Sequence, residues 1–277
     1  MEQMRLNKYL AEHGICSRRE ADRLIEQCRV TVNGQIASMG TKVSDEDEVA
    51  LNGKKIGGKP KTVVLAFYKP VGVTCSEKDR HAEKLITDVI HYPVRVTYAG
   101  RLDKDSEGLI LLTNDGNLID AMMRGANRHE KEYVVRVDKE ITEEFLENMR
   151  AGVYLKELDQ ITRTCQVEQE GKYTFRIILT QGLNRQIRRM CQVLGYEVKK
   201  LKRARIMNIK LDKIPYGKYR EVTGEELEEL YRQAGLLMVR LKAEEKSKSD
   251  SGRRFPDRQA VAEAGRTREG RIFHGYK

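Results

Sequence analysis

A charged, glycine-bracketed segment, residues 99–108, runs without interruption into the apolar residues 109–112. Glycine allows the close backbone bends of a loop, and the apolar run after it predicts a buried strand. This segment therefore predicts a loop held on a rigid strand, where catalytic and binding residues concentrate. Asp103 stands between Arg101 and Lys104, so an ionised carboxylate is available as a nucleophile or base. The alternative is a solvated turn whose charges pair weakly at the surface.

Strands and helices mix along residues 62–235 without the regular alternation of a doubly wound sheet, which predicts an α+β domain. The helical patterns include segments that begin at Thr142 and at Thr223, where Thr223 and Glu226 have the spacing of a capping box. The patterns typical of strands cover residues 63–68, 132–137, 161–167, 173–180, 198–201 and 205–211.

Residues 5–54 predict a small separate module of two helices followed by hairpins. Ser17 and Glu20 form a capping box at the start of the second helix. Asn33-Gly34 and Asn52-Gly53 are typical of two-residue hairpin turns, because both positions of such a turn need a positive φ.

The composition changes twice along the chain. Residues 55–61 are rich in glycine and lysine and read as a linker, which sets the larger domain at residues 62–241. Residues 242–277 mix Ser, Gly, Arg and Glu with little to bury and predict a basic, disordered tail.

The net charge of +10 favours a polyanionic partner, although the same charge serves solubility or attraction to an anionic membrane surface. No apolar run is long enough to span a bilayer, and the N-terminus has no signal-peptide core, so we expect a cytoplasmic protein with no membrane partner. The five cysteines form no Cys-x-x-Cys pair and the histidines are scattered, so we expect no metal and no zinc site.

The loop Gly100-Arg101-Leu102-Asp103 closely resembles the catalytic segment of RsuA-type RNA pseudouridine synthases. That resemblance implies that Asp103 is the nucleophile that attacks a flipped uridine and that Arg101 lies near the displaced base. Residues 130–135 resemble the family segment in which a tyrosine stacks on the target base, here Tyr133, while Lys131 supports the site or contacts the RNA backbone.

Residues 182–190 supply the third segment of this resemblance. By it, Arg188 is the basic partner of Asp103 and Leu183 is an apolar wall of the pocket. The alternative reading is a helix face that binds phosphates. Many relatives have a histidine where this chain has Arg185. In this respect the chain resembles the RluF branch of the family, which modifies 23S ribosomal RNA.

The N-terminal module resembles the αL, or S4-like, RNA-binding module of a small-subunit ribosomal protein. The alternative is a pair of helices with ordinary surface charges. If the resemblance holds, five basic side chains face phosphates, where contacts position a protein without reading sequence. They are Arg5, Lys8, Arg18, Arg19 and Arg23.

The resemblance implies an S4-like module linked to a mixed, mainly antiparallel sheet domain that isomerises a uridine in large-subunit ribosomal RNA, with a transfer RNA as a further substrate. It implies base flipping, no cofactor and, by default, a monomer. Attack at ribose C1′ and attack at uracil C6 both stay open. One rival is a non-catalytic RNA-binding or ribosome-assembly protein. The other is a metal nuclease that uses Asp103 and Asp105, for which no third acidic ligand is evident.

Overall fold

A computed structural model describes residues 3–76, 83–124 and 127–236. The predicted tail, 242–277, and the last residues of the predicted large domain, 237–241, lie outside the described residues.

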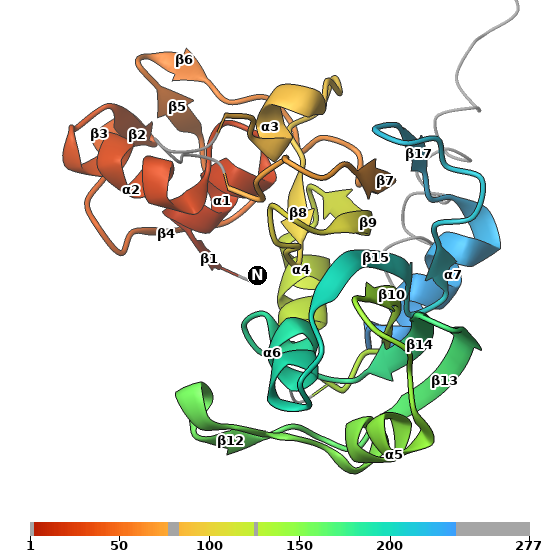
Figure 1. The fold of residues 1–277 in the computed structure, drawn as a ribbon. Helices are drawn as coiled ribbons and strands as arrows, with labels where there is room; N and C mark the ends of the chain where they lie inside the picture. Colours follow the sequence, from red (N-terminus) through yellow and green to blue (C-terminus); the bar gives the residue numbers. More distant parts are fainter. Residues whose placement is uncertain (1–2, 77–82, 125–126, 237–277) are drawn as a thin grey trace, which may run out of the picture. The chain divides into compact units, whose positions relative to one another are not determined.

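The N-terminal module contains two helices and short strands (Figure 1). Ser17 accepts a hydrogen bond from the Glu20 amide at 3.2 Å, which confirms the predicted N-cap. Asn33, Gly34, Asn52 and Gly53 all have positive φ, as the predicted hairpin turns require. The second hairpin includes Lys55, the first residue of the predicted linker. The elements are β1 (Met4–Arg5), α1 (Leu6–Glu12), α2 (Arg18–Glu26), β2 (Val30–Val32), β3 (Gln35–Ile36), β4 (Lys42–Val43), β5 (Val49–Leu51) and β6 (Lys54–Lys55).

The larger domain is built on one mixed sheet with the strand order β13-β14-β10-β15-β9-β7-β17, so the predicted α+β class is confirmed. Neighbouring strands run antiparallel except for β9 and β15, which run parallel. The strands are β7 (Val64–Lys69), β8 (Thr97–Ala99), β9 (Glu107–Thr113), β10 (Lys131–Val137), β11 (Tyr154–Leu155), β12 (Gln160–Ile161), β13 (Gln166–Gly171), β14 (Thr174–Leu179), β15 (Val198–Ile206), β16 (Ile209–Lys210) and β17 (Tyr219–Glu221).

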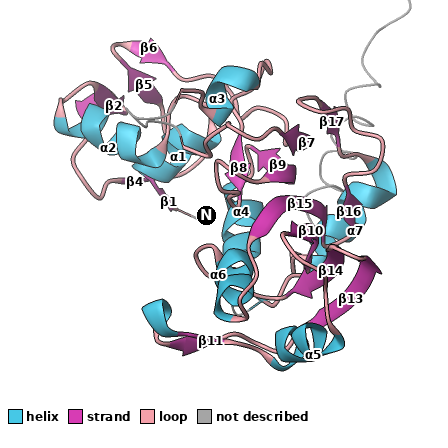
Figure 2. Cartoon of the chain, viewed as in Figure 1, coloured by secondary structure: helices cyan, strands magenta, loops and turns pink. Residues whose placement is uncertain are grey.

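Helices pack on both faces of this sheet (Figure 2). Phe145 of α5 and Met190 of α6 share a hydrophobic cluster with Tyr133 and Val135 of β10. On the other face, α4 and α7 pack against alternate residues of β7 and β9, such as Ala66. The helices are α3 (Ile86–Val89), α4 (Gly116–Met123), α5 (Glu143–Ala151), α6 (Gln186–Val193) and α7 (Gly224–Gln233), with a 3-10 turn, η2 (Lys156–Leu158).

Several sequence expectations in this domain are wrong. The predicted strand over residues 161–167 is divided between β12, which ends at Ile161, and β13, which begins at Gln166. β15 is one continuous strand across residues 198–206, where the pattern predicts a break after residue 201. Within it, Arg203 is almost fully buried, although it stands among the basic residues Lys202 and Arg205. Thr223 makes no side-chain cap at α7. The Glu226 carboxylate, which the reciprocal half of the capping box requires, is instead held by both terminal nitrogens of Arg220 at 2.6 and 2.7 Å.

Candidate active site

The Asp103 loop is the connection between β8 and β9, which pair antiparallel. Gly100 opens the loop with a φ of +95°, a conformation that favours glycine. The Ser106 amide donates a hydrogen bond to the Asp103 carbonyl at 3.1 Å, so the loop turns back on itself before β9 begins. The Asp103 side chain remains 36% exposed, which leaves its carboxylate accessible to a substrate.

Two buried cations hold this loop from beneath. The Nζ of Lys69 donates to the Ser106 carbonyl at 2.7 Å and to the Pro70 carbonyl at 2.8 Å. Arg203 donates from Nε to the Leu109 carbonyl at 2.6 Å and from Nη1 to the Arg101 carbonyl at 3.3 Å. Arg203 therefore connects the residues before and after Asp103, and the Asp103 loop is fixed at both ends by side chains that are almost fully buried.

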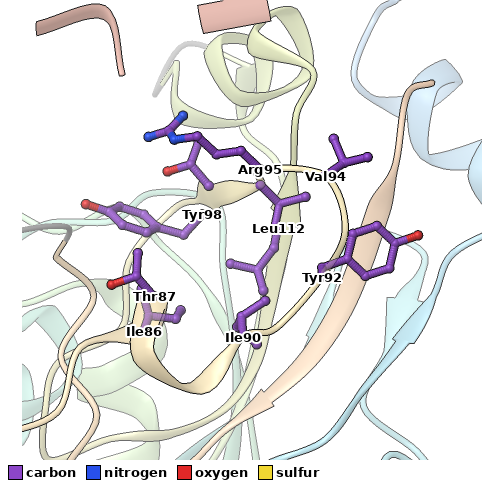
Figure 3. Close-up of a pocket in the computed structure, with 10 residues that line it drawn as sticks. Ile86, Thr87, Ile90, Tyr92, Val94, Arg95, Tyr98 and Leu112 are labelled. Atoms are coloured by element: carbon purple, nitrogen blue, oxygen red, sulfur yellow. The ribbon is translucent and has the colours of Figure 1, made fainter. Parts of the chain in front are cut away.

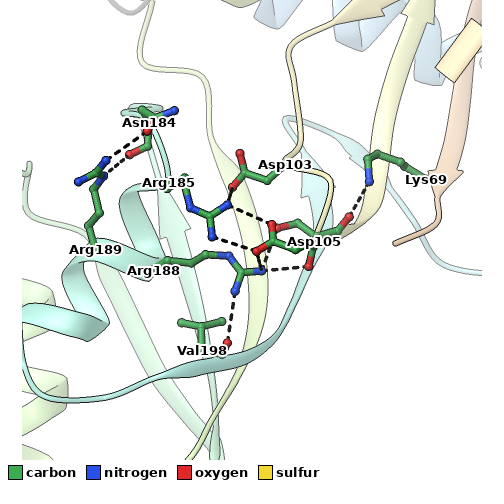
Figure 4. A network of polar contacts seen from close by, with 9 residues as sticks. Lys69, Asp103, Asp105, Asn184, Arg185, Arg188, Arg189 and Val198 are labelled. Atoms are coloured by element: carbon green, nitrogen blue, oxygen red, sulfur yellow. Dashed lines mark hydrogen bonds and ion pairs between the residues drawn. The ribbon is translucent and has the colours of Figure 1, made fainter. Parts of the chain in front are cut away.

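The start of α6 supplies the charges that face the loop (Figure 4). Arg185 is the N-cap residue of α6 and has a left-handed backbone, with a φ of +50°. Its guanidinium donates to both carboxylate oxygens of Asp105, at 3.2 and 2.9 Å, and lies 3.6 Å from the Asp103 carboxylate. Arg185 is thus the cation within ion-pair distance of both acids.

The expected ion pair between Arg188 and Asp103 is not formed. Arg188 donates instead to the Asp105 carbonyl at 3.0 Å and the Ser106 hydroxyl at 3.3 Å, and its Nη2 lies 3.3 Å from the Asp105 carboxylate. The reason is geometric: the left-handed turn at Arg185 carries that side chain over the loop, whereas Arg188 reaches the loop's base one helical turn later. Arg188 positions the loop, and Arg185 faces the Asp103 carboxylate.

Asp105 is a structural anchor in this site. Burial raises its pKa, but the hydrogen bond from Arg185 and the charges of Arg188 and Arg185 outweigh that effect, so the pKa lies below its usual value. Among the described residues, no group of three or more His, Cys, Asp or Glu side chains could hold a metal ion.

One cleft, with a volume of about 590 Å³, brings the predicted residues of the large domain together. Tyr133 comes from β10 with only 9% exposure, so its ring forms part of the cleft wall. Leu183, in the turn before α6, adds an apolar side chain. The predicted site residues that line this cleft are Arg101, Asp103, Lys131, Tyr133, Leu183, Arg185 and Arg188.

The cleft also has a buried cationic wall. Burial lowers the pKa of Lys131 to about 8, and the charge of Arg203 acts in the same direction. Burial likewise lowers the pKa of Lys69 to about 8. Sequence reasoning missed Lys69 and Arg203, although Lys69 precedes a proline at a strand end and Arg203 lies in a basic run that follows a strand pattern.

We expect Lys131 to act in its charged form, so activity should decrease as the pH rises through about 8. Unfolding does not explain such a loss of activity. Between about pH 8 and the pKa of about 10.4 that lysine has in the unfolded chain, the unfolded chain binds more protons than the folded protein. The contribution of Lys131 to stability therefore rises with pH in this range. The rate of product formation against pH measures the effect. Lys131→Arg should shift the alkaline fall of the pH–rate profile to higher pH, because arginine keeps its charge. An unchanged alkaline fall in Lys131→Arg would contradict this role.

A second hollow, about 200 Å³ in volume, lies beside α3 and β8 (Figure 3). It is lined mainly by apolar and aromatic side chains, including Tyr92 and Tyr98, and Arg95 is its one charged residue in the described part of the chain. It contains none of the predicted site residues, so we assign the chemistry to the cleft at Asp103.

The five predicted phosphate contacts of the N-terminal module differ in their partners. Arg5, Arg18 and Arg19 are exposed. Lys8 lies 3.6 Å from the Glu12 carboxylate, and Arg23 lies 3.0 Å from the Glu20 carboxylate. Their contact with RNA stays a prediction.

Comparison with known families identifies both parts of the chain. The S4 domain family matches residues 4–49, and the RNA pseudouridylate synthase family matches residues 63–193. The dual-specificity RNA pseudouridine synthase RluF of Escherichia coli (strain K12) is 50% identical over 231 residues, which are 83% of this chain and 79% of RluF. The chain belongs to the RNA pseudouridine synthases.

It is an RsuA-type pseudouridine synthase with an S4 domain, as the resemblance predicts. The ribosomal large subunit pseudouridine synthase B of Bacillus subtilis (strain 168) is 36% identical over a region that spans 82% of this chain and 95% of that protein. The crystal structure of a pseudouridylate synthase matches with a TM-score of 0.61 and 29% identity, over 82% of this chain and 99% of that one. Membership in this family favours an enzyme over a non-catalytic RNA-binding protein. The structure describes no helix that is long and apolar enough to cross a membrane.

Proposed function

We propose that this pseudouridine synthase isomerises a uridine in 23S ribosomal RNA, with Asp103 as a covalent nucleophile on a flipped base. The observation that carries the proposal is the cleft, in which an accessible carboxylate, a tyrosine ring and arginines from three separate segments converge. Likeness to RluF and to the large-subunit synthase of Bacillus subtilis supports the choice of RNA, and such a substrate is found in the cytoplasm. The dual specificity in the name of RluF supports a transfer RNA as a second substrate.

Different residues of the cleft act in different steps of the reaction. Flipping the uridine out of its stack costs a few kcal/mol. Stacking of the base on Tyr133 and contacts between the RNA backbone and cations such as Arg101 offset this cost. Asp103 attacks C1′ or C6, and the bond between N1 and C1′ breaks. The uracil turns within the cleft and C5 bonds to C1′, while the bond from the Asp103 carboxylate to C1′ or C6 breaks and frees the carboxylate. Loss of the C5 proton and uptake of a proton at N1 complete the isomerisation. Leu183 and the Tyr133 ring hold the freed base in place.

The test is release of tritium from RNA labelled at uridine C5. The purified chain, given a 23S ribosomal RNA transcript, should release the label into water, because the C5 proton is lost only when C5 becomes bonded to the ribose. A transfer RNA transcript is assayed in parallel. Full retention of the label in the 23S transcript, with RNA binding intact, would refute the proposal. Shortened RNA that depends on added divalent metal would indicate the nuclease instead.

We expect Arg185→Ala to lower kcat by about 10²-fold, because misplacing a catalytic group by about 1 Å has an effect of that size. Arg185 is the cation nearest Asp103, and it fixes Asp105 with two hydrogen bonds. Single-turnover tritium release, measured beside the RNA Kd, separates chemistry from binding. Arg185→Lys should recover only part of the rate, since lysine cannot make the two parallel hydrogen bonds. If Arg185→Ala weakens RNA binding and leaves the single-turnover rate unchanged, Arg185 is a phosphate contact instead.

A further inference from the structure

The half of the sheet formed by β10, β14 and the first part of β15 has one face that no described helix covers. Tyr133 and Val135 of β10 point into the core, so Val134 and Arg136 point to the opposite face. The strand register places Lys202 opposite Val134 and Lys200 opposite Arg136. Val134 belongs to none of the hydrophobic clusters of the described residues.

This face carries a cluster of cations. Beside it, a hollow of about 550 Å³ between β10, β15 and β16 is lined by Lys202 and Lys210, together with the acidic residues Glu132 and Asp212. None of the residues that we call the outer cationic face forms an ion pair with a described residue. These residues are Arg136, Lys200, Lys202 and Lys210.

Several carboxylates lie near the outer cationic face, and two of them pair with other cations. Glu132 pairs with both Arg176 and Arg205, and Glu170 also pairs with Arg176. Glu168 lies opposite Arg176 across β13 and β14, and Glu107 lies opposite Lys202 across β9 and β15. The balance of charge on this face is therefore positive.

The arrangement is unfavourable for the protein by itself. Arg136 and Lys200 are a directly opposed cross-strand pair, and like charges in that position destabilise a sheet. Lys202 stands two residues further along the same strand, roughly 7 Å away at the usual rise per residue. Three cations placed so close, none of them in an ion pair with a described residue, are typical of a surface that meets an anionic partner.

We propose that the outer cationic face binds the phosphate backbone of a second segment of the substrate RNA, an inference that rests on the function proposed above. Alternate residues of the same strands face opposite ways: Tyr133 and Arg203 line the catalytic cleft, whereas Val134 and Lys202 line the outer hollow. The segment on this face is therefore not the one whose base enters the cleft. The face has no aromatic anchor of the kind that dominates protein interfaces, and its flexible lysines suit phosphates.

The experiment compares two double charge reversals in the full chain. Arg136→Glu/Lys200→Glu alters the outer cationic face. Lys156→Glu/Lys218→Glu makes the same change in net charge at two exposed lysines elsewhere in the domain. Kd is measured against salt for a 23S ribosomal RNA transcript and for a short synthetic hairpin with uridine in its loop. Tritium release on both RNAs is measured in parallel.

On the long transcript, we expect the outer-face variant to raise Kd by roughly tenfold and to reduce the slope of log Kd against log salt by about 2, since each phosphate contact contributes about 0.9. The hairpin should bind and react as with the wild type, because it is too small to reach the opposite face. Single Lys200→Glu should preserve or raise the thermal midpoint, since it converts a like-charge pair into an opposite-charge pair, so weaker binding is not a folding defect.

An equal loss of RNA affinity in both double variants would overturn the proposal, because it would show an effect of overall charge. An equal loss of affinity for both RNAs would also overturn it, because it would show an effect on the cleft. Unchanged binding of the long transcript would also overturn it and would assign the face to a partner other than RNA. Failure of the proposed function is a separate result, because the wild type would then release no tritium from either RNA.

Discussion

Asp103→Ala is expected to abolish pseudouridine formation, with a loss on the order of 10⁴-fold or more, as for removal of other covalent nucleophiles. The carboxylate of Asp103 is the acid that opens directly onto the cleft, and no neighbouring side chain can replace it in the same position. Tritium release under single-turnover conditions measures the loss. Residual release at a substantial fraction of the wild-type rate would show that another group attacks the uridine.

Fold and RNA affinity should survive this substitution. The Asp103 side chain is partly exposed, and among the described residues its one ion pair is the 3.6 Å contact with Arg185. Asp105→Asn is the matched control, because it lies in the same loop and contacts the same arginine. It should reduce the rate by a smaller factor, since it loosens the loop without removing the nucleophile. Thermal unfolding and the Kd for RNA should stay close to wild type for Asp103→Ala.

The sequence was sufficient to predict which residues line the cleft, but not how their side chains pair. The Asp103 loop, Tyr133 and the segment 182–190 carry local patterns, and the structure places all three in one cleft. Which arginine faces Asp103 could not be predicted, because the answer depends on the positive φ of Arg185 at the start of α6. Periodicity along a helix says which residues share a face but not how the chain enters the helix.

The buried cations were missed for a different reason. Lysine and arginine are rarely fully buried, so a sequence reading places Lys69 and Arg203 at the surface by default. Their burial depends on tertiary partners, the carbonyls of Ser106 and Leu109, which are brought to them by strand pairing. The failed capping box at Thr223 has the same cause: Arg220 competes for the Glu226 carboxylate, and its proximity is set by β17 and the turn into α7.

The junction of β9 and β15 explains why a glycine follows the catalytic loop. These strands pair at Glu107–Lys202 and Gly108–Arg203, directly beside the loop and at the one parallel step of the sheet. Gly108 has a φ of +119°, and a Cβ built there would lie 2.4 Å from both the backbone nitrogen and the backbone oxygen of Arg203. Those atoms belong to a paired strand, so they cannot move aside as a side chain could.

Gly108→Ala should therefore lower the free energy of unfolding by about 3–5 kcal/mol, since it combines backbone strain with a clash against backbone. Gly116→Ala is the control, because a Cβ at that helical position meets nothing within 4 Å; replacing glycine there should change stability by no more than about 1 kcal/mol. Urea titration at neutral pH measures both. A Gly108→Ala protein as stable as Gly116→Ala would mean that the strands are not paired as described. Where Gly108→Ala remains folded, activity should still decrease, because separating β15 from β9 withdraws Arg203 from the carbonyls that hold both ends of the Asp103 loop.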